Sequence, residues 1–268
     1  MRLKVLVDNN TYIDQYYHGE PAVSYYIEDG DMRLLFDVGY SDIFIKNSDL
    51  MGVDLENINA IVISHGHDDH TRGLKYYFEQ GFKSNISVIA HPDAFKEKIA
   101  NDLRICSPIL AEELKGKCNL ILSKEARKIS KNITFLGEIP QLNNFEKRKS
   151  IGKQNIDGTF IDDYIMDDTA LVYQTEKGIY IITGCSHSGI CNIIEYAKEV
   201  CKDSRVLGVI GGFHLFEVSE QVAKTIDYLK QNNIKELYPC HCTSFIVRAE
   251  IHNTLPVKEV GVGLELEW

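Results

Sequence analysis

The stretch "SHGHDDHTRG" at residues 64–73 places three histidines and two aspartates within six consecutive positions, directly after an apolar run typical of a buried strand. Imidazole and carboxylate groups are ligands for zinc, iron and manganese, so the cluster predicts a metal site. A tight turn would direct His65 and His67 to one side. Asp69 and His70 would then point to another side, and we therefore expect two metal ions a few ångströms apart.

The composition is that of an ordinary soluble globular protein of 268 residues, with a net charge of −10. Acidic residues outnumber basic ones by 39 to 29, whereas nucleic-acid binding needs a basic surface. We therefore expect no nucleic-acid partner. No apolar window is long enough to span a membrane, and "MRLKVLVDNN" at 1–10 reaches Asp8 too early for a signal peptide. These features predict a cytoplasmic protein without a membrane partner.

The seven cysteines form an odd set without C-x-x-C spacing, which favours reduced thiols over a disulfide framework. Cys191 and Cys201 lie on an apolar helical stripe and are expected in the core. Cys185, Cys240 and Cys242 each lie within two residues of a histidine, so a role at a metal site stays open for them.

Apolar runs separated by turn signals predict strands and helices along the chain. Residues 22–39 indicate two strands around a Gly-Asp turn, and 170–184 indicate a second hairpin. Strands and helices alternate over 189–241, and Ser219 is the expected start of the helix at 219–233. The pattern predicts a mixed α/β fold with helices covering the sheet.

We expect a single domain over residues 1–268. The segment at about 98–160 is more polar and less regular than the rest of the chain, and we interpret it as an insertion or cap. Whether it forms a lid over a site stays open.

Histidines recur at the predicted C-terminal ends of separate strands. His65 and His67 follow one strand. His187, His214 and His241 each follow another strand further along the chain. Because α/β folds assemble their sites from loops at strand ends, this recurrence favours a shared functional site.

The motif H-x-H-x-D-H at 65–70 resembles the first metal motif of the metallo-β-lactamase fold superfamily, and "LLFDVG" at 34–39 is similar to its F-D-x-G strand. Further motifs resemble a subgroup labelled 7,8-dihydropterin-6-methyl-4-(β-D-ribofuranosyl)aminobenzene-5′-phosphate synthase or metal-dependent hydrolase. These motifs are "DDTAL" (167–171), "GCSHSGI" (184–190), "GGFHL" (211–215) and "PCHC" (239–242). The resemblance implies an αββα sandwich of two mixed sheets with outer helices and a binuclear metal site at one edge.

The resemblance also implies a ligand set. His65, His67 and His187 are expected to hold one metal ion. Asp69, His70 and His241 are expected to hold the other. The two ions are expected to be zinc, with iron or manganese as alternatives.

Two departures from the family pattern leave other roles open. The usual third histidine has no counterpart, and Gly184-Cys185 stands where a Gly-Asp with a bridging aspartate is usual, so Cys185 is a candidate bridging ligand. Asp37 is expected to hydrogen-bond a metal-ligating histidine without itself binding the metal, and Asp168 is expected to act as an orienting carboxylate. His214 is expected to contact substrate or transfer a proton.

Two cations that share a water molecule supply hydroxide at neutral pH, which makes hydrolysis the default chemistry. The leading hypothesis is hydrolysis of an ester, lactone or phosphoester of a small metabolite, one that is phosphorylated or pterin-like. Asp69 is the expected catalytic carboxylate, and Arg72, beside His70, is a candidate substrate contact.

Three alternatives remain open from the sequence. One is the pterin-type synthase of the subgroup label, and another is an iron-dependent oxidoreductase similar to persulfide dioxygenases. The third is a non-catalytic metal-binding sensor, which the large ligand set disfavours because structural zinc sites are usually closed and four-coordinate. A homo-oligomer is compatible with all of them.

Overall fold

The computed structural model describes residues 1–82 and 86–268, and the described chain divides into two compact units. The first unit contains Met1–Lys124, Ser150–Asp167 and Gly261–Trp268. The second contains Glu125–Lys149 and Asp168–Val260. The expected single domain with an insertion at about 98–160 stays a prediction.

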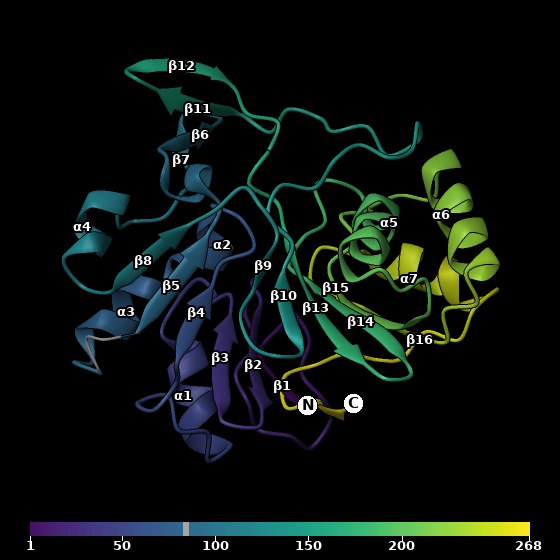
Figure 1. Ribbon diagram of the computed structural model, residues 1–268, viewed down its shortest axis with the longest axis horizontal. Helices are drawn as coiled ribbons and strands as arrows, with labels where there is room; N and C mark the ends of the chain where they lie inside the picture. Colours follow the sequence, from purple (N-terminus) through teal and green to yellow (C-terminus); the bar gives the residue numbers. More distant parts are fainter. Residues whose placement is uncertain (83–85) are drawn as a thin grey trace. The chain divides into compact units, whose positions relative to one another are not determined.

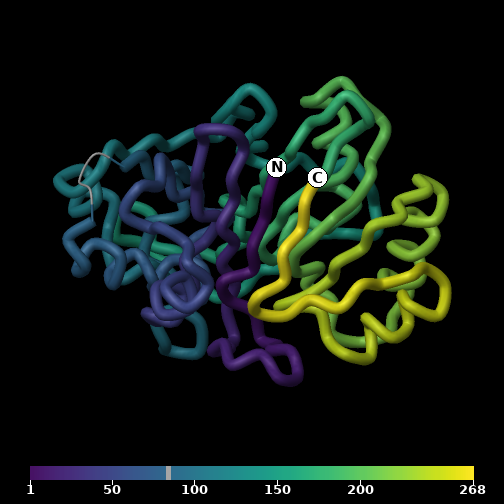
Figure 2. The backbone as a smooth tube through the Cα atoms, turned by 90° about the horizontal axis from the view of Figure 1, so that it is seen from below, coloured from purple at the N-terminus to yellow at the C-terminus, as the bar shows by residue number. Residues whose placement is uncertain are grey.

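The first unit is built on a seven-stranded mixed sheet (Figure 1). Its strands in spatial order are β17 (Glu265–Glu267), β1 (Arg2–Val7), β2 (Ser24–Asp29), β3 (Met32–Phe36), β4 (Ala60–Val62), β5 (Ser87–Ala90) and β8 (Asn119–Leu122). β2 and β3 form the predicted hairpin, and Gly30 adopts the positive φ of +61° that its tight turn requires. Figure 2 shows the first and last segments of the chain side by side, where β1 pairs with β17.

One face of this sheet packs against helices. Leu35, Ile61 and Val88 pair with one another across β3, β4 and β5, so their side chains share one face of the sheet. They form a buried core with Phe44 and Leu74. The last two residues belong to α1 (Ile43–Leu50) and α3 (Gly73–Glu79). Short helical turns complete the unit: α2 (Asp68–Thr71), a 3-10 turn (Pro92–Phe95) and α4 (Ala111–Lys115).

The first unit also contains a small four-stranded sheet that the sequence pattern did not predict. Its strands in spatial order are β12 (Thr159–Asp162), β11 (Lys153–Ile156), β6 (Lys98–Ala100) and β7 (Leu103–Arg104). The start of the expected insertion, β6, thus pairs with β11 near its end. The backbone N–H of Asp68 donates to Ile105 at 3.0 Å, which ties the start of α2 to the chain after β7.

The second unit has a six-stranded mixed sheet (Figure 1). Its strands in spatial order are β16 (Glu236–Pro239), β15 (Val206–Gly211), β14 (Gly178–Thr183), β13 (Ala170–Thr175), β10 (Ile133–Phe135) and β9 (Arg127–Lys128). β14, β15 and β16 are mutually parallel, so their C-terminal ends lie at one edge of the sheet.

Three helices cover this second sheet with apolar side chains: α5 (Ile190–Cys201), α6 (Glu220–Gln231) and α7 (Phe245–His252). Ser219 caps α6 as predicted, since its side chain accepts a hydrogen bond from the Val222 backbone. The predicted mixed α/β class is confirmed. No helix among the described residues is both long enough and apolar enough to cross a membrane.

Candidate metal centre

The histidine cluster forms a buried loop at the C-terminal end of β4, followed at once by α2. His65 and His70 are fully buried and His67 is 9 % exposed. Gly66 permits this turn because a Cβ at that position would lie only 2.2 Å from the carbonyl oxygen of Ala94. The loop therefore passes close to the backbone of Ala94 between two histidines whose side chains are buried.

Two of the imidazoles meet through their ring nitrogens. His65 Nε2 lies 3.0 Å from His67 Nδ1, and one ligand atom each of His65, His67 and Asp69 lie within 4.8 Å of one another. Burial lowers the pKa of His67 to about 4, which leaves this imidazole neutral at neutral pH. Neutral imidazole is the form that binds metals, so the donor set fits a divalent cation.

Asp37 and Ser64 anchor the loop from behind. Asp37 Oδ2 lies 2.7 Å from His70 Nδ1, while Asp37 Oδ1 accepts the Ser64 backbone N–H at 2.7 Å. The Ser64 hydroxyl lies 3.0 Å from His65 Nδ1. These contacts hold the Nδ1 side of both imidazoles and direct Nε2 away from the anchor, the arrangement expected behind a metal ligand.

Burial lowers the pKa of His70, but the carboxylates of Asp69 and Asp37 outweigh it and raise the pKa well above its usual value. Asp69 Oδ2 lies 3.4 Å from His70 Nε2. The two carboxylates thus favour a positive charge at this imidazole, and a cation would replace the proton there.

A buried ion cluster supports the loop from another direction. Lys98 is fully buried, and its Nζ lies 2.8 Å from Asp163 Oδ2 and 2.7 Å from Asp167 Oδ1. The second oxygen of Asp167 accepts the Gly66 backbone N–H at 2.6 Å. The cluster therefore fixes the peptide between His65 and His67.

In the second unit, the parallel strands deliver candidate ligands from a common edge. Cys185 and His187 follow β14, His214 follows β15 and His241 follows β16. The rings of His187 and His214 lie 4.1 Å apart between centroids, at an angle of 50°. The sequence pattern of histidines at strand ends thus corresponds to one sheet edge in this unit.

Asp168 orients the loop that carries His187. The fully buried Asp168 accepts hydrogen bonds from the Ser188 backbone at 2.9 Å and the Ser188 hydroxyl at 2.6 Å. These contacts lie one residue away from His187, and the orienting role of Asp168 stays a prediction.

Cys242, whose role the sequence left open, lies at the same sheet edge. One ligand atom each of Cys185, His214 and Cys242 lie within 4.8 Å of one another, and Cys242 Sγ lies 3.4 Å from the carbonyl oxygen of Cys185. Burial would raise the pKa of the Cys242 thiol, but interactions with Cys185 and His214 lower it well below its usual range. The thiolate, the metal-binding form, is thereby favoured.

A family model for the "Metallo-beta-lactamase superfamily" matches residues 19–199. The chain belongs to this superfamily. Tm1679, described as a metal-dependent hydrolase of the beta-lactamase superfamily, has a crystal structure with a TM-score of 0.84 and 28% identity. The match covers 100% of this chain and 99% of that chain. The predicted metallo-β-lactamase fold is confirmed.

Two curated relatives come from Methanocaldococcus jannaschii. An uncharacterized protein is 38% identical over 246 residues, which cover 91% of each chain. The other, named 7,8-dihydropterin-6-methyl-4-(beta-D-ribofuranosyl)-aminobenzene-5'-phosphate synthase, is 33% identical over 224 residues. That match covers 80% of this chain and 76% of the relative. The subgroup resemblance inferred from the motifs is also confirmed.

Arg72, the candidate substrate contact, interacts with Tyr40. Its guanidinium donates to the Tyr40 hydroxyl at 2.7 Å and lies 4.4 Å from the centre of the Tyr40 ring. Both side chains are partly exposed, so Tyr40 fixes the Arg72 guanidinium at a position that solvent can reach. Its role in binding substrate stays a prediction.

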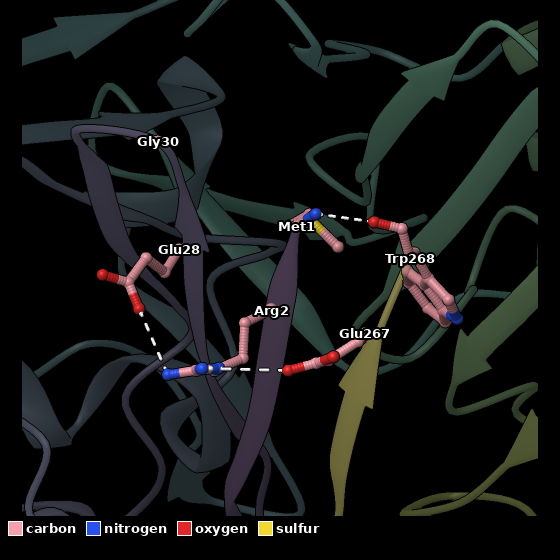
Figure 3. Close-up of a pocket in the computed structure, with 6 residues that line it drawn as sticks. All are labelled: Met1, Arg2, Glu28, Gly30, Glu267 and Trp268. Atoms are coloured by element: carbon pink, nitrogen blue, oxygen red, sulfur yellow. Dashed lines mark hydrogen bonds and ion pairs between the residues drawn. The ribbon is translucent and has the colours of Figure 1, made fainter.

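A surface pocket of the first unit contains none of the predicted site residues (Figure 3). Its charged groups pair with one another: Arg2 with Glu28 at 3.8 Å and with Glu267 at 3.7 Å. The Met1 ammonium donates to the Trp268 carbonyl at 2.6 Å. These internal pairs leave little charge for a ligand, so the histidine loops remain the candidate site.

Sequence reasoning missed the cluster of Lys98, Asp163 and Asp167. Lys98 lies in the polar stretch "KEKIA" (96–100), which is typical of a solvated surface, and its partners are 65 and 69 residues away. Only Asp167, the first residue of the "DDTAL" motif, gave a local signal. Cys242 was signalled by its place next to His241.

Proposed function

We propose that this superfamily member is a metal-dependent hydrolase that uses two divalent ions, expected to be zinc, on a small metabolite. The substrate would be an ester, a lactone or a phosphoester. The observation that supports it is the convergence of His65, His67 and Asp69 within ligand distance, with two ring nitrogens 3.0 Å apart.

The expected ligand sets are part of this proposal. His65, His67 and His187 would hold one ion, and Asp69, His70 and His241 the other. When bound, the ions supply a water of lowered pKa and an electrophile for the oxygen that gains charge.

The residues of the chain contribute positioning and proton transfer. The Asp69 side chain is 28% exposed, unlike the fully buried His70, so one carboxylate oxygen can reach a solvent molecule and accept its proton. His214 is partly exposed beside His187 and is suited to donate a proton to a leaving group. Asp37 and Asp168 keep their loops in place during this transfer.

The test uses two adjacent carboxylates. Hydrolysis of bis(p-nitrophenyl) phosphate and p-nitrophenyl acetate is measured for zinc-loaded protein, Asp69→Asn and the control Asp68→Asn. We expect Asp69→Asn to lower kcat by roughly 100-fold or more, within the range that a proton-transfer group contributes. Asp68→Asn should retain activity, because Asp68 is not in the ligand cluster. Equal activity in all three proteins would contradict the proposal.

A second candidate function is the pterin-type synthase, favoured by the 33% identical relative of that name. The two candidates differ in their need for a reduced pterin. Isothermal titration of metal-loaded protein with a dihydropterin separates them: tight binding, with no turnover of the ester and phosphoester panel, would favour the synthase. Turnover of the panel without pterin binding would favour the hydrolase.

A further inference from the structure

Three consecutive parallel strands of the second unit each deliver one soft or imidazole donor from the C-terminal end. Cys185 follows β14, His214 follows β15 and Cys242 follows β16. One ligand atom from each lies within 4.8 Å of the other two. All three belong to one compact unit, so the group is complete without any residue of the histidine loop after β4.

Backbone hydrogen bonds lock the three loops to one another. Gly212 donates to Gly184 at 2.9 Å, and Cys240 donates to Gly211 at 3.0 Å. Phe213 donates to the Thr243 hydroxyl at 2.9 Å. These bonds fix the donors before any ligand arrives, which is the preorganisation a metal site needs.

The loops also hold non-glycine residues in the left-handed region. The φ angles are 58° at Ser186, 51° at His214 and 48° at His241. Such conformations cost free energy and persist where the surrounding structure enforces them, commonly at ligand sites.

Gly212 leaves room for the Cys242 sulfur because it has no side chain. A Cβ at Gly212 would lie 2.4 Å from Cys242 Sγ and 2.7 Å from the Gly184 carbonyl oxygen. His214 Nδ1 is buried without a hydrogen-bond partner within the described part of the chain. An imidazole with one unpartnered nitrogen, and with a ring nitrogen within 4.8 Å of two thiols, is suited to receive a cation.

We propose that Cys185, His214 and Cys242 form a metal site of their own, with two thiolates and one imidazole, for a thiophilic cation such as Zn²⁺. Thiolate donors select zinc and other soft cations over magnesium or calcium. The three protein donors leave a fourth tetrahedral position open. His214 and Cys242 are partly exposed, so a cation can reach the site from solvent. The site shares His214 with the proposed hydrolase mechanism, so a bound cation would replace the proton that this imidazole is proposed to donate there.

The experiment follows Co²⁺ binding to metal-free, reduced protein by the thiolate-to-cobalt charge-transfer absorption in the near ultraviolet. The double variant His65→Ala/His67→Ala removes imidazoles of the other unit, and we expect the thiolate absorption to persist in it. Cys242→Ser should lose much of the absorption and weaken Co²⁺ binding by more than the roughly 10- to 100-fold that an outer-shell change costs. The matched control Cys201→Ser should leave both unchanged.

Two results would overturn the proposal. One is unchanged absorption in Cys242→Ser. The other is loss of the absorption in His65→Ala/His67→Ala, which would assign the Cys185 thiolate to the other donor set. If Cys242→Ser does not fold by circular dichroism, His214→Gln serves instead. It keeps both thiolates, so it should retain the absorption with weaker Co²⁺ affinity, and unchanged affinity would count against the site.

Discussion

Lys98 Nζ lies 2.7 Å from Asp167 Oδ1, and the other oxygen of that carboxylate accepts the backbone N–H of Gly66. A buried cation in the small sheet is thereby connected, through one side chain, to the peptide between His65 and His67. The polar segment that the sequence presents as an insertion thus supports the histidine loop from within the first unit.

Replacing Lys98 by methionine should destabilise the protein strongly. The change keeps the length of the side chain but leaves Asp163 and Asp167 buried without their cation, which typically costs about 3–5 kcal/mol. The free energy of unfolding in urea measures it. Lys96→Met is the control: Lys96 is 35% exposed and paired with Asp93, so its loss should cost at most about 1 kcal/mol. Similar losses in both variants would contradict the role assigned to Lys98.

The effect of Lys98→Met should depend on pH. Burial raises the pKa of Asp167, but the Lys98 ammonium outweighs it and holds the pKa below its usual value. Stability from such a group is present above the unfolded-state pKa of about 3.9 and is lost as pH falls through the lower folded value. The difference in unfolding free energy between parent and variant should therefore be full at neutral pH and shrink on acidification, because the carboxylates that Lys98→Met leaves buried without a cation also take up protons as the pH falls. A difference that grows on acidification would refute this account.

Asp37→Asn should weaken metal binding while the fold is retained. The carboxylate contacts His70 Nδ1 at 2.7 Å, and losing such an outer-shell partner typically costs roughly 10- to 100-fold in metal affinity. Competition with a chromophoric chelator gives the affinity. Asp31→Asn, an exposed change on the same hairpin, is the control and should bind metal as the parent does. Equal affinities for the two variants would remove Asp37 from the site.

Gly66→Ala should disturb the histidine loop directly. The added methyl group would lie 2.2 Å from the Ala94 carbonyl oxygen, so the backbone must shift, at a cost of about 1–3 kcal/mol. Metal affinity should fall with it, because the shift moves His65 and His67 apart. Gly116→Ala, whose Cβ would meet only an ordinary contact at 3.6 Å, should stay within about 0.5 kcal/mol of the parent. Thermal unfolding with and without zinc measures both effects.

Local patterns predicted the parts of the fold that have local causes. The turn at Gly30 and the cap at Ser219 are set by neighbouring residues, and both lie where the sequence indicates. The helix α7 was missed because Phe245 and Ile246 at its start are exposed, at 80% and 58%, which hides the apolar stripe. The small sheet was missed because its strands are two to four residues long and largely polar.

The candidate site also contains residues that a local motif indicates and residues that only long-range contacts bring together. His65, His67 and Asp69 stand within one short motif, so their convergence follows from a single turn. Lys98 could not be assigned from sequence, because its burial depends on carboxylates more than 60 residues away. Cys242 gave a local signal only through the adjacent His241, and its proximity to Cys185 depends on the parallel order of β14, β15 and β16.

The central claim is that the histidine loop holds catalytic metal. It is tested most directly by the metal content per chain of protein purified without chelator, compared with His67→Ala and Cys185→Ala. The account predicts two divalent ions in the parent, expected to be zinc, and fewer in His67→Ala. Loss of metal in Cys185→Ala would add the thiolate to the ligands. A single iron would favour oxygen or persulfide chemistry instead, and no metal under metal-replete conditions would contradict the account.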